Sequence, residues 1–273
     1  MLDKKVGIIG CGVMGQAILS GFLASSLIND RNIRITTIPE MLSDLKAAFP
    51  QVDANSDNMA TIEWADVVIF SLKPHILLDF GTDHEVQNVL NVPGKLVISI
   101  AGGVSLSQLG QFIKAPAELI RVMPNIAAMV QESMNIITAG EGCSSESLEL
   151  CKILFEATGR CQVLPESQLD VATALCGCSP AFFCTIIEAL GSGAVKMGLN
   201  PKLAYELAAQ TMAGTAQMML NTGEHPGVLR DKVTTPGGIT IDGLAVMEEG
   251  NIRSVLSKTI EHCTEKSRNM CNK

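Results

Sequence analysis

The chain has 273 residues, 47% of them hydrophobic and 18% charged, a composition that suits a compact protein with room for two domains. Acidic residues outnumber basic ones by 28 to 20, and no run of Lys or Arg alternates with aromatic residues, so the electrostatic footprint of a nucleic-acid-binding protein is missing. We find no signal-peptide core and no stretch of about 18 apolar residues, and we therefore expect a cytoplasmic protein without a membrane span.

The nine cysteines are scattered, without a CxxC pair or a histidine at zinc-site spacing. Cys176 and Cys178 lie two residues apart, but no second pair completes a metal site. We therefore predict no metal site, and we interpret the cysteines as small, mostly buried residues in a reducing compartment.

The first two thirds of the chain alternate between short apolar runs and amphipathic stretches. The apolar runs predict strands over residues 5–10, 33–38, 65–71, 96–100, 119–123 and 135–139, and helices are expected over 14–27 and 41–49. Strands that alternate with helices predict a mostly parallel sheet wrapped by helices. From about residue 169 onward helical spacing dominates, through 185–194, 202–220 and 239–247.

A glycine-rich motif joins the first strand to the first helix. It reads Gly10-Cys11-Gly12-Val13-Met14-Gly15 and fits the pattern GxGxxG. Gly10 allows a tight turn, Gly12 lets the backbone approach a pyrophosphate, and Gly15 allows close packing of helix and strand. The alternative is a simple turn, but the strand before it and the helix after it favour a dinucleotide site.

The end of the second strand bears on the choice between NAD and NADP. An NAD site places a carboxylate there, about 20 residues beyond the motif. This chain has Thr36-Thr37-Ile38, and its first acid, Glu40, lies beyond Pro39. Threonine hydroxyls can donate to a 2'-phosphate. We predict that NADPH is preferred and that NADH is the weaker alternative.

Six segments resemble the pyrroline-5-carboxylate reductases, in the order in which that family has them. They are the motif from Gly10, Ser71-Leu72-Lys73-Pro74-His75, Ile100-Ala101-Gly102-Gly103-Val104, Arg121-Val122-Met123-Pro124-Asn125, Ser179-Pro180-Ala181-Phe182, and the segment from His225 to Leu244 that contains Thr235-Pro236-Gly237-Gly238-Ile239-Thr240. Together they span most of the chain.

The resemblance implies an α/β fold, with a Rossmann-like NADP-binding domain over residues 1–165 and a helical domain over 166–273 that binds substrate and dimerises. It implies that 1-pyrroline-5-carboxylate is reduced to L-proline by a nicotinamide hydride, the last step of proline biosynthesis. It also implies a homodimer that can assemble further, for example into a decamer.

The resemblance also assigns roles to residues. The substrate site comprises Thr235, Gly237, Gly238, Ile239, Thr240 and Glu166. Backbone amides at the start of a helix suit the substrate carboxylate. Thr240 matches the threonine beside the substrate nitrogen and is the predicted catalytic residue. The alternative for Thr240 is an ordinary helix N-cap.

The remaining cofactor residues follow from the same match. Ser71, Leu72, Lys73 and Pro74 are expected along the nicotinamide half of the cofactor, with Ala101 and Gly102 close by. Asn58 matches a residue near the adenosine ribose, and Thr37 one near the 2'-phosphate. For Lys73 we prefer a structural role to that of a catalytic acid.

The chain departs from the family at several positions, among them Ser133, where glycine is usual, and Ile239, where many members have threonine. Cys176 and Cys178 replace usual serines, and Ile126-Ala127 stands where Thr-Pro is usual. These changes leave room for a related cyclic imine as substrate. A β-hydroxyacid dehydrogenase is a rival, although the flanks of Lys196 lack that family's pattern. The second rival is a cofactor-binding regulator without catalysis, although Thr240, Gly237 and Gly238 are retained.

Overall fold

The structure is a computed structural model that describes residues 2–271. The chain divides into two compact units. The first unit runs to Cys178 and includes the chain again from Cys263 onward, and the second unit is Ser179–His262.

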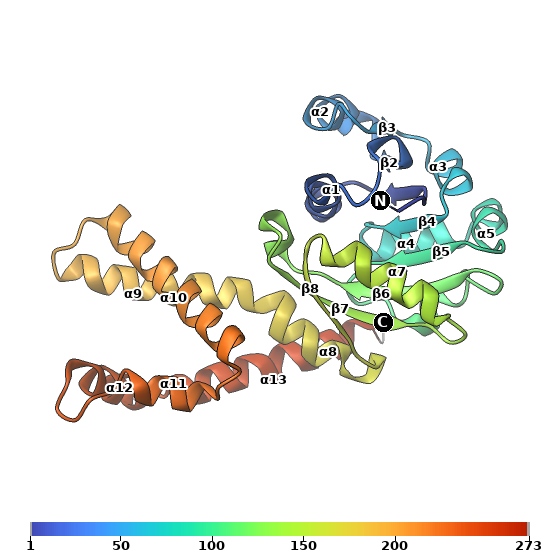
Figure 1. Ribbon diagram of the computed structural model, residues 1–273. Helices are drawn as coiled ribbons and strands as arrows, with labels where there is room; N and C mark the ends of the chain where they lie inside the picture. Colours follow the sequence, from blue (N-terminus) through green and yellow to red (C-terminus); the bar gives the residue numbers. More distant parts are fainter. Residues whose placement is uncertain (1, 272–273) are drawn as a thin grey trace. The chain divides into compact units, whose positions relative to one another are not determined.

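The first unit is built on an eight-stranded sheet with the order β3-β2-β1-β4-β5-β6-β7-β8 (Figure 1). All neighbouring strands are parallel except β6 and β7. The strands are β1 (Val6–Ile9), β2 (Ile33–Thr36), β3 (Asp53–Asn55), β4 (Val67–Phe70), β5 (Leu96–Ser99), β6 (Glu118–Met123), β7 (Ser133–Ala139) and β8 (Gly159–Val163).

The central strands β1, β4 and β5 are buried along their whole length. Helices cover both faces of the sheet, which explains why these strands are apolar at every position rather than at alternate ones. The helices of this unit are α1 (Val13–Ser25), α2 (Leu42–Ala48), α3 (Asn58–Trp64), α4 (Pro74–Gly81), α5 (His84–Leu90), α6 (Leu106–Leu109), α7 (Ser145–Glu156) and α8 (Leu169–Ala172).

Two apolar clusters fill the space between the sheet and its helices. One joins the sheet to α1, α2 and α7 and includes Phe22 and Phe155. The other lies on the opposite face, against α3, α4, α5 and α6, and includes Phe70 and Leu77. A smaller cluster continues this second face under α8. The predicted mostly parallel sheet wrapped by helices is confirmed.

Two strands, β3 and β8, were not predicted, and β2 ends before its predicted boundary. β3 is only three residues long and polar, and β8 has the sequence GRCQV without apolar alternation, so neither has a strand pattern. β2 ends at Thr36 rather than at residue 38. The backbone leaves the sheet there, and Pro39 begins the short 3₁₀ helix η2 (Pro39–Met41).

The second unit is helical, as the sequence indicated. It contains α9 (Ser179–Lys196), α10 (Pro201–Thr222), α11 (Pro226–Lys232), α12 (Ile239–Glu249) and the first part of α13 (Ile252–Cys271). α9 and α10 pack against each other (Figure 1). Gly191 faces the ring of Tyr205 so closely that a Cβ at this position would collide with it, so this glycine permits the close approach of the two helices.

A continuous helical run, Glu166–Lys196, is apolar enough and long enough to cross a bilayer by length and composition alone. Only 17% of its most apolar 18-residue stretch is buried within the chain. This corrects our expectation that the chain has no apolar segment long enough to span a membrane. The run joins η4 (Glu166–Gln168), α8, the π-helical turn η5 (Thr173–Cys178) and α9.

Candidate functional site

The glycine-rich loop leaves the carboxyl end of β1 and enters α1. Gly10 has a φ of +84°, a left-handed conformation that favours glycine, and a Cβ there would collide with the side chain of Leu72. Gly12 precedes α1 as its N-cap. Gly15 lies against Ser71, because a Cβ at Gly15 would be 3.1 Å from Ser71 Oγ. The tight turn and the close packing predicted for Gly10 and Gly15 are therefore present.

The space outside Gly12 is open. A Cβ at Gly12 would meet no described atom within 4 Å. Val13, the first residue of α1, is 66% exposed, and the first N–H groups of a helix have no partner within the helix. An open backbone beside unpaired amides at the positive end of a 13-residue helix fits a pyrophosphate.

Cys11 is fully buried beneath this loop. Burial raises the pKa of its thiol to about 12. The thiol therefore stays protonated at neutral pH and acts as a small packing group.

The other predicted cofactor residues follow neighbouring strands at the same edge of the sheet. Ser71–Pro74 follow β4, Ala101 and Gly102 follow β5, and Asn58 begins α3 just after β3. β1 lies between β2 and β4, so the chain progresses in opposite directions on its two sides. In parallel α/β sheets, ligands bind at the carboxyl ends of the strands at such a reversal. The structure thus brings these residues to one edge.

The end of β2 holds the glycine loop in place. The Gly10 amide donates to Thr36 Oγ1 at 3.2 Å, and the Cys11 amide donates to the Thr36 carbonyl at 2.6 Å. Thr36 is buried, whereas Thr37 is partly exposed and its amide donates to the Asn55 carbonyl at 3.2 Å. The hydroxyl of Thr36 is thus bound to the loop, and Thr37 is the threonine that faces outward.

In the second unit, Thr235–Gly238 form a tight turn. The Gly238 amide donates to the Thr235 carbonyl at 3.0 Å, and Gly237 has a φ of +67°. Proline followed by a glycine with positive φ is the pattern of a type II turn. Gly238 is the N-cap of α12, so the turn leads directly into the helix.

The amides that follow this turn are accessible. Ile239, the first residue of α12, is 94% exposed, and Thr240 is exposed at the second helical position. The N-cap position belongs to Gly238, so the alternative role of Thr240 as an N-cap is excluded. The segment presents free amides and one hydroxyl, an arrangement that can bind a small carboxylate.

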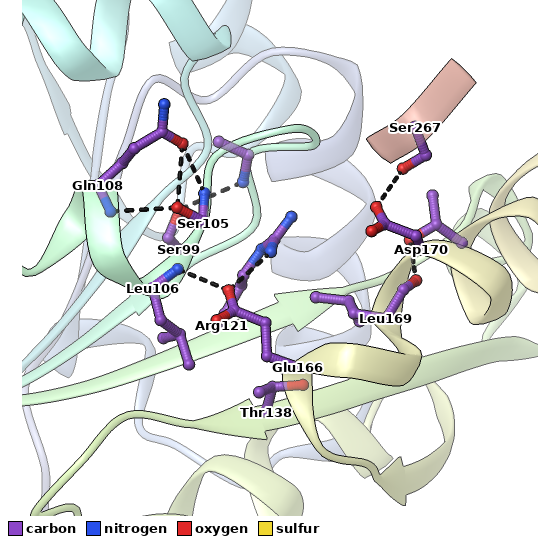
Figure 2. Close-up of polar contacts among 12 residues, drawn as sticks. Ser99, Ser105, Leu106, Gln108, Arg121, Thr138, Glu166, Leu169, Asp170 and Ser267 are labelled. Carbon is purple, nitrogen blue, oxygen red and sulfur yellow. Dashed lines mark hydrogen bonds and ion pairs between the residues drawn. The ribbon is translucent and has the colours of Figure 1, made fainter. Parts of the chain in front are cut away.

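Glu166 belongs to the first unit, whereas the other predicted substrate residues belong to the second. Its Oε1 accepts from the Leu106 amide at 2.6 Å and from Arg121 Nη1 at 3.1 Å, as Figure 2 shows. The side chain of Glu166 is 35% exposed and that of Arg121 is 4% exposed. Glu166 is therefore engaged within its own unit.

Two residues of this region were not predicted from the sequence. Thr36 could not be distinguished from Thr37, because burial is not visible in the sequence. Arg121 lies in a segment that resembles the family, but no role was predicted for it. Its signal was available, since it is the one charge between apolar residues in Leu119-Ile120-Arg121-Val122-Met123.

Comparison with known proteins agrees with this arrangement. Residues 166–270 match the family model described as pyrroline-5-carboxylate reductase dimerisation. Residues 5–103 match the model described as NADP oxidoreductase coenzyme F420-dependent. The first match covers the mainly helical region, and the second covers strands β1 to β5 of the sheet, while residues 104–165 lie outside both matches.

Full-length relatives and structures are also found. The chain is 37% identical to a pyrroline-5-carboxylate reductase of Methanosarcina acetivorans, covering 100% of both chains, and 36% identical to that of Schizosaccharomyces pombe, covering 94% of this chain and 96% of the relative. The pyrroline-5-carboxylate reductase structure from Coxiella burnetii has a TM-score of 0.90 at 28% identity, covering 98% of this chain and 99% of that chain. The pyrroline carboxylate reductase of Plasmodium falciparum, solved with NADP bound, has a TM-score of 0.88 at 27% identity, covering 99% of both chains. The chain belongs to the pyrroline-5-carboxylate reductase family.

Proposed function

We propose that this protein reduces 1-pyrroline-5-carboxylate to L-proline with NADPH, the last step of proline biosynthesis. The observation that carries this proposal is the full-length match to relatives named for this reaction, at 35–37% identity. The glycine loop, with its open approach at Gly12, agrees with a dinucleotide cofactor. The structural neighbour with NADP bound supports the choice of cofactor.

When bound, the cofactor would supply a hydride to the ring carbon of the C=N bond. We assign its pyrophosphate to the amides around Gly10–Gly15, its 2'-phosphate to Thr37, and its adenosine ribose to Asn58. Ser71–Pro74 with Ala101 and Gly102 line its nicotinamide half. Each of these segments follows a strand at the carboxyl edge of the sheet, which supports the assignment.

The protein's own part is to bind, orient and shield the substrate. We assign the substrate carboxylate to the amides of the segment Thr235–Thr240, because this turn and helix start present them without obstruction. The Thr240 hydroxyl is assigned to the substrate nitrogen, where it can hydrogen-bond the group that gains a proton. A protonated imine is already electrophilic, so the reaction needs no covalent nucleophile.

We further propose that the protein is a cytoplasmic homodimer, in which residues 166–270 form the subunit interface. Apolar side chains such as Phe183, Leu190 and Met197 are exposed in the single chain, and a partner subunit would cover them. The apolar run Glu166–Lys196 begins the same region, so we assign its apolarity to this interface and not to a membrane. We propose a decamer as the higher assembly. Light scattering after size exclusion measures both states, and a monomer would contradict the dimer.

The reaction is tested by steady-state oxidation of NADPH with 1-pyrroline-5-carboxylate. Parallel reactions contain pyrroline-2-carboxylate or a 3-hydroxy acid, the latter with NADP⁺ as oxidant. We expect the highest kcat/KM with 1-pyrroline-5-carboxylate, and a higher kcat/KM with NADPH than with NADH. A preference for pyrroline-2-carboxylate would show that the substrate is a related cyclic imine. Turnover of the hydroxy acid alone would show that the protein is a hydroxyacid dehydrogenase and not an imine reductase.

A further inference from the structure

We propose that Arg121 and Glu166 are a pair of positioning residues that hold the loop between β5 and α6, residues 100–105, in the place where it meets the nicotinamide. The inference rests on the proposed function, because Ala101 and Gly102 of this loop are assigned to the cofactor. It concerns a different question, namely what fixes this loop before the cofactor binds.

Glu166 joins three segments that are far apart in the sequence. One oxygen, Oε1, accepts from the Leu106 amide at the start of α6 and from the guanidinium of Arg121 on β6. Figure 2 shows the carboxylate between these two donors. Both partners are distant, at separations of 60 and 45 residues, so the bonds record tertiary structure and not local turn geometry.

Arg121 is the buried member of the pair. It lies in register with Ser99 on β5 and with Thr138 on β7. Cross-strand neighbours share a face of the sheet, so Ser99, Arg121 and Thr138 form a buried row on one face. The apolar cluster under α4–α6 lies on one side of this row, and the cluster under α8 lies on the other. A guanidinium between two apolar clusters requires a partner for its charge. Its Nε has none among the residues that the structure describes, and Glu166 is the carboxylate that it contacts.

The loop is restrained at both ends. At its beginning, the Ala101 amide donates to Ser99 Oγ at 3.3 Å. At its end, Ser105 and Gln108 form a capping box, and the next amide, that of Leu106, donates to Glu166. Gly102 and Gly103 lie between these restraints, and Gly103 has a φ of +76°.

At the start of the loop, the Ile100 amide also reaches a distant segment, because it donates to the Phe70 carbonyl of β4 at 3.0 Å. At the end of the loop, the bond to Glu166 is the restraint that reaches beyond the local sequence. The bonds at Ser99 and Ser105 span two or three residues and move with the loop itself. The bond to Glu166 ties the start of α6 to β6, a strand of the buried sheet. Because glycines make the loop backbone permissive, we infer that this tie determines where Ala101 and Gly102 stand. Glu166 then acts on the cofactor through the loop and not by direct contact with the substrate.

The experiment compares Arg121→Met and Glu166→Gln with the matched control Thr138→Val. Thr138 belongs to the same buried row, and its hydroxyl donates to the Leu164 carbonyl at 3.0 Å, away from the loop. The control therefore removes a buried polar contact beside Arg121 without touching the tie to α6. Amide hydrogen exchange of residues 100–109 without cofactor, the Kd for NADPH, and the KM of each substrate are measured for all proteins.

We expect both variants to speed exchange in residues 100–109 and to raise the Kd for NADPH about 10-fold, which corresponds to about 1.4 kcal/mol of binding free energy. The KM for 1-pyrroline-5-carboxylate should stay within about 2-fold of the wild-type value. The Kd of the double variant for NADPH should not exceed the higher of the two single-variant values, because the effects of contacting residues that act together are not additive. Thr138→Val should leave exchange and NADPH binding unchanged.

Two outcomes would overturn the inference. Unchanged exchange in both variants would show that the pair does not hold the loop. A raised KM for 1-pyrroline-5-carboxylate in Glu166→Gln alone would make Glu166 a substrate ligand. Should either variant fail to fold, Arg121→Lys and Glu166→Asp keep the charges but misplace the contacts, and the same readouts decide. A wild-type protein that binds NADPH without reducing the imine would remove the proposed function, while exchange and binding would still decide on the pair.

Discussion

Thr36 holds Gly10 by its side chain: the Gly10 amide donates to Thr36 Oγ1 at 3.2 Å, while the Thr36 carbonyl accepts from the next amide, that of Cys11, at 2.6 Å. The last residue of β2 thus fixes the start of the glycine loop that follows β1. This bond explains why a threonine is buried at a strand end, and it assigns the two neighbouring threonines different tasks.

Replacing Thr36 with valine keeps the shape but removes the acceptor for the Gly10 amide. A buried donor without a partner costs about 1–3 kcal/mol, and because the Gly10 amide is only partly buried we take the lower end of that range. We expect the free energy of unfolding to fall by this amount and the Kd for NADPH to rise several-fold, as seen by urea unfolding and by titration of the cofactor. Thr36→Ser keeps the hydroxyl and should retain cofactor affinity. Equal affinity of Thr36→Val and wild type would show that the loop does not depend on this bond.

Gly12→Ala and Gly10→Ala separate cofactor binding from stability. Gly12 has a φ of −79°, and its Cβ would meet no described atom within 4 Å, so alanine should change stability by less than about 0.5 kcal/mol. The same Cβ would occupy the approach of the pyrophosphate, and we expect NADPH affinity to fall by about 10-fold or more.

Gly10→Ala is the opposite case, because its positive φ and the collision with Leu72 strain the fold. Alanine there should destabilise the protein by about 1–3 kcal/mol. Thermal unfolding and calorimetric titration with NADPH measure both effects. Normal NADPH binding by Gly12→Ala would show that the pyrophosphate does not bind at this loop.

Thr240→Ala should lower kcat/KM by about 10–1000-fold, the effect of losing a positioned polar group. Because Thr240 is exposed and Gly238 is the N-cap, the melting temperature of this variant should stay close to that of the wild type. Thr240→Ser retains the hydroxyl and should recover most of the rate. Near-normal turnover of Thr240→Ala would exclude Thr240 from the mechanism.

Alkaline pH should destabilise the protein in part through Cys11. Its thiol has an ordinary pKa of 9.0, and burial raises this pKa to about 12 in the folded protein. Between these values the unfolded chain loses a proton that the folded protein keeps, so stability from this group is complete below pH 9 and declines as pH rises toward 12.

The loss amounts to at most a few kcal/mol, on the order of 1.4 per pH unit. Urea unfolding at several pH values above 9 measures the slope, and Cys11→Ala should show a shallower one even though its starting stability is lower. Parallel slopes for the two proteins would assign the alkaline loss to other groups.

Apolar runs were sufficient to locate β1, β4 and β5, because buried parallel strands are apolar at every position. Helical spacing located α1, α2, α9, α10 and α12, whereas α7 and α13 were not predicted. β3 and β8 could not be found in this way. Each pairs along one side only, at an edge of the sheet, and takes its place from the neighbouring strand rather than from its own residues.

The sequence by itself determined the family, the glycine loop and the Thr235–Thr240 turn, since these depend on residue types at fixed short spacing, where backbone geometry follows from glycine and proline. Only the tertiary structure decided which threonine is buried against Gly10, that Arg121 is enclosed between two apolar clusters, and that Glu166 reaches the start of α6. Burial and long-range hydrogen bonds depend on which segments meet in space, and local spacing carries no record of that meeting.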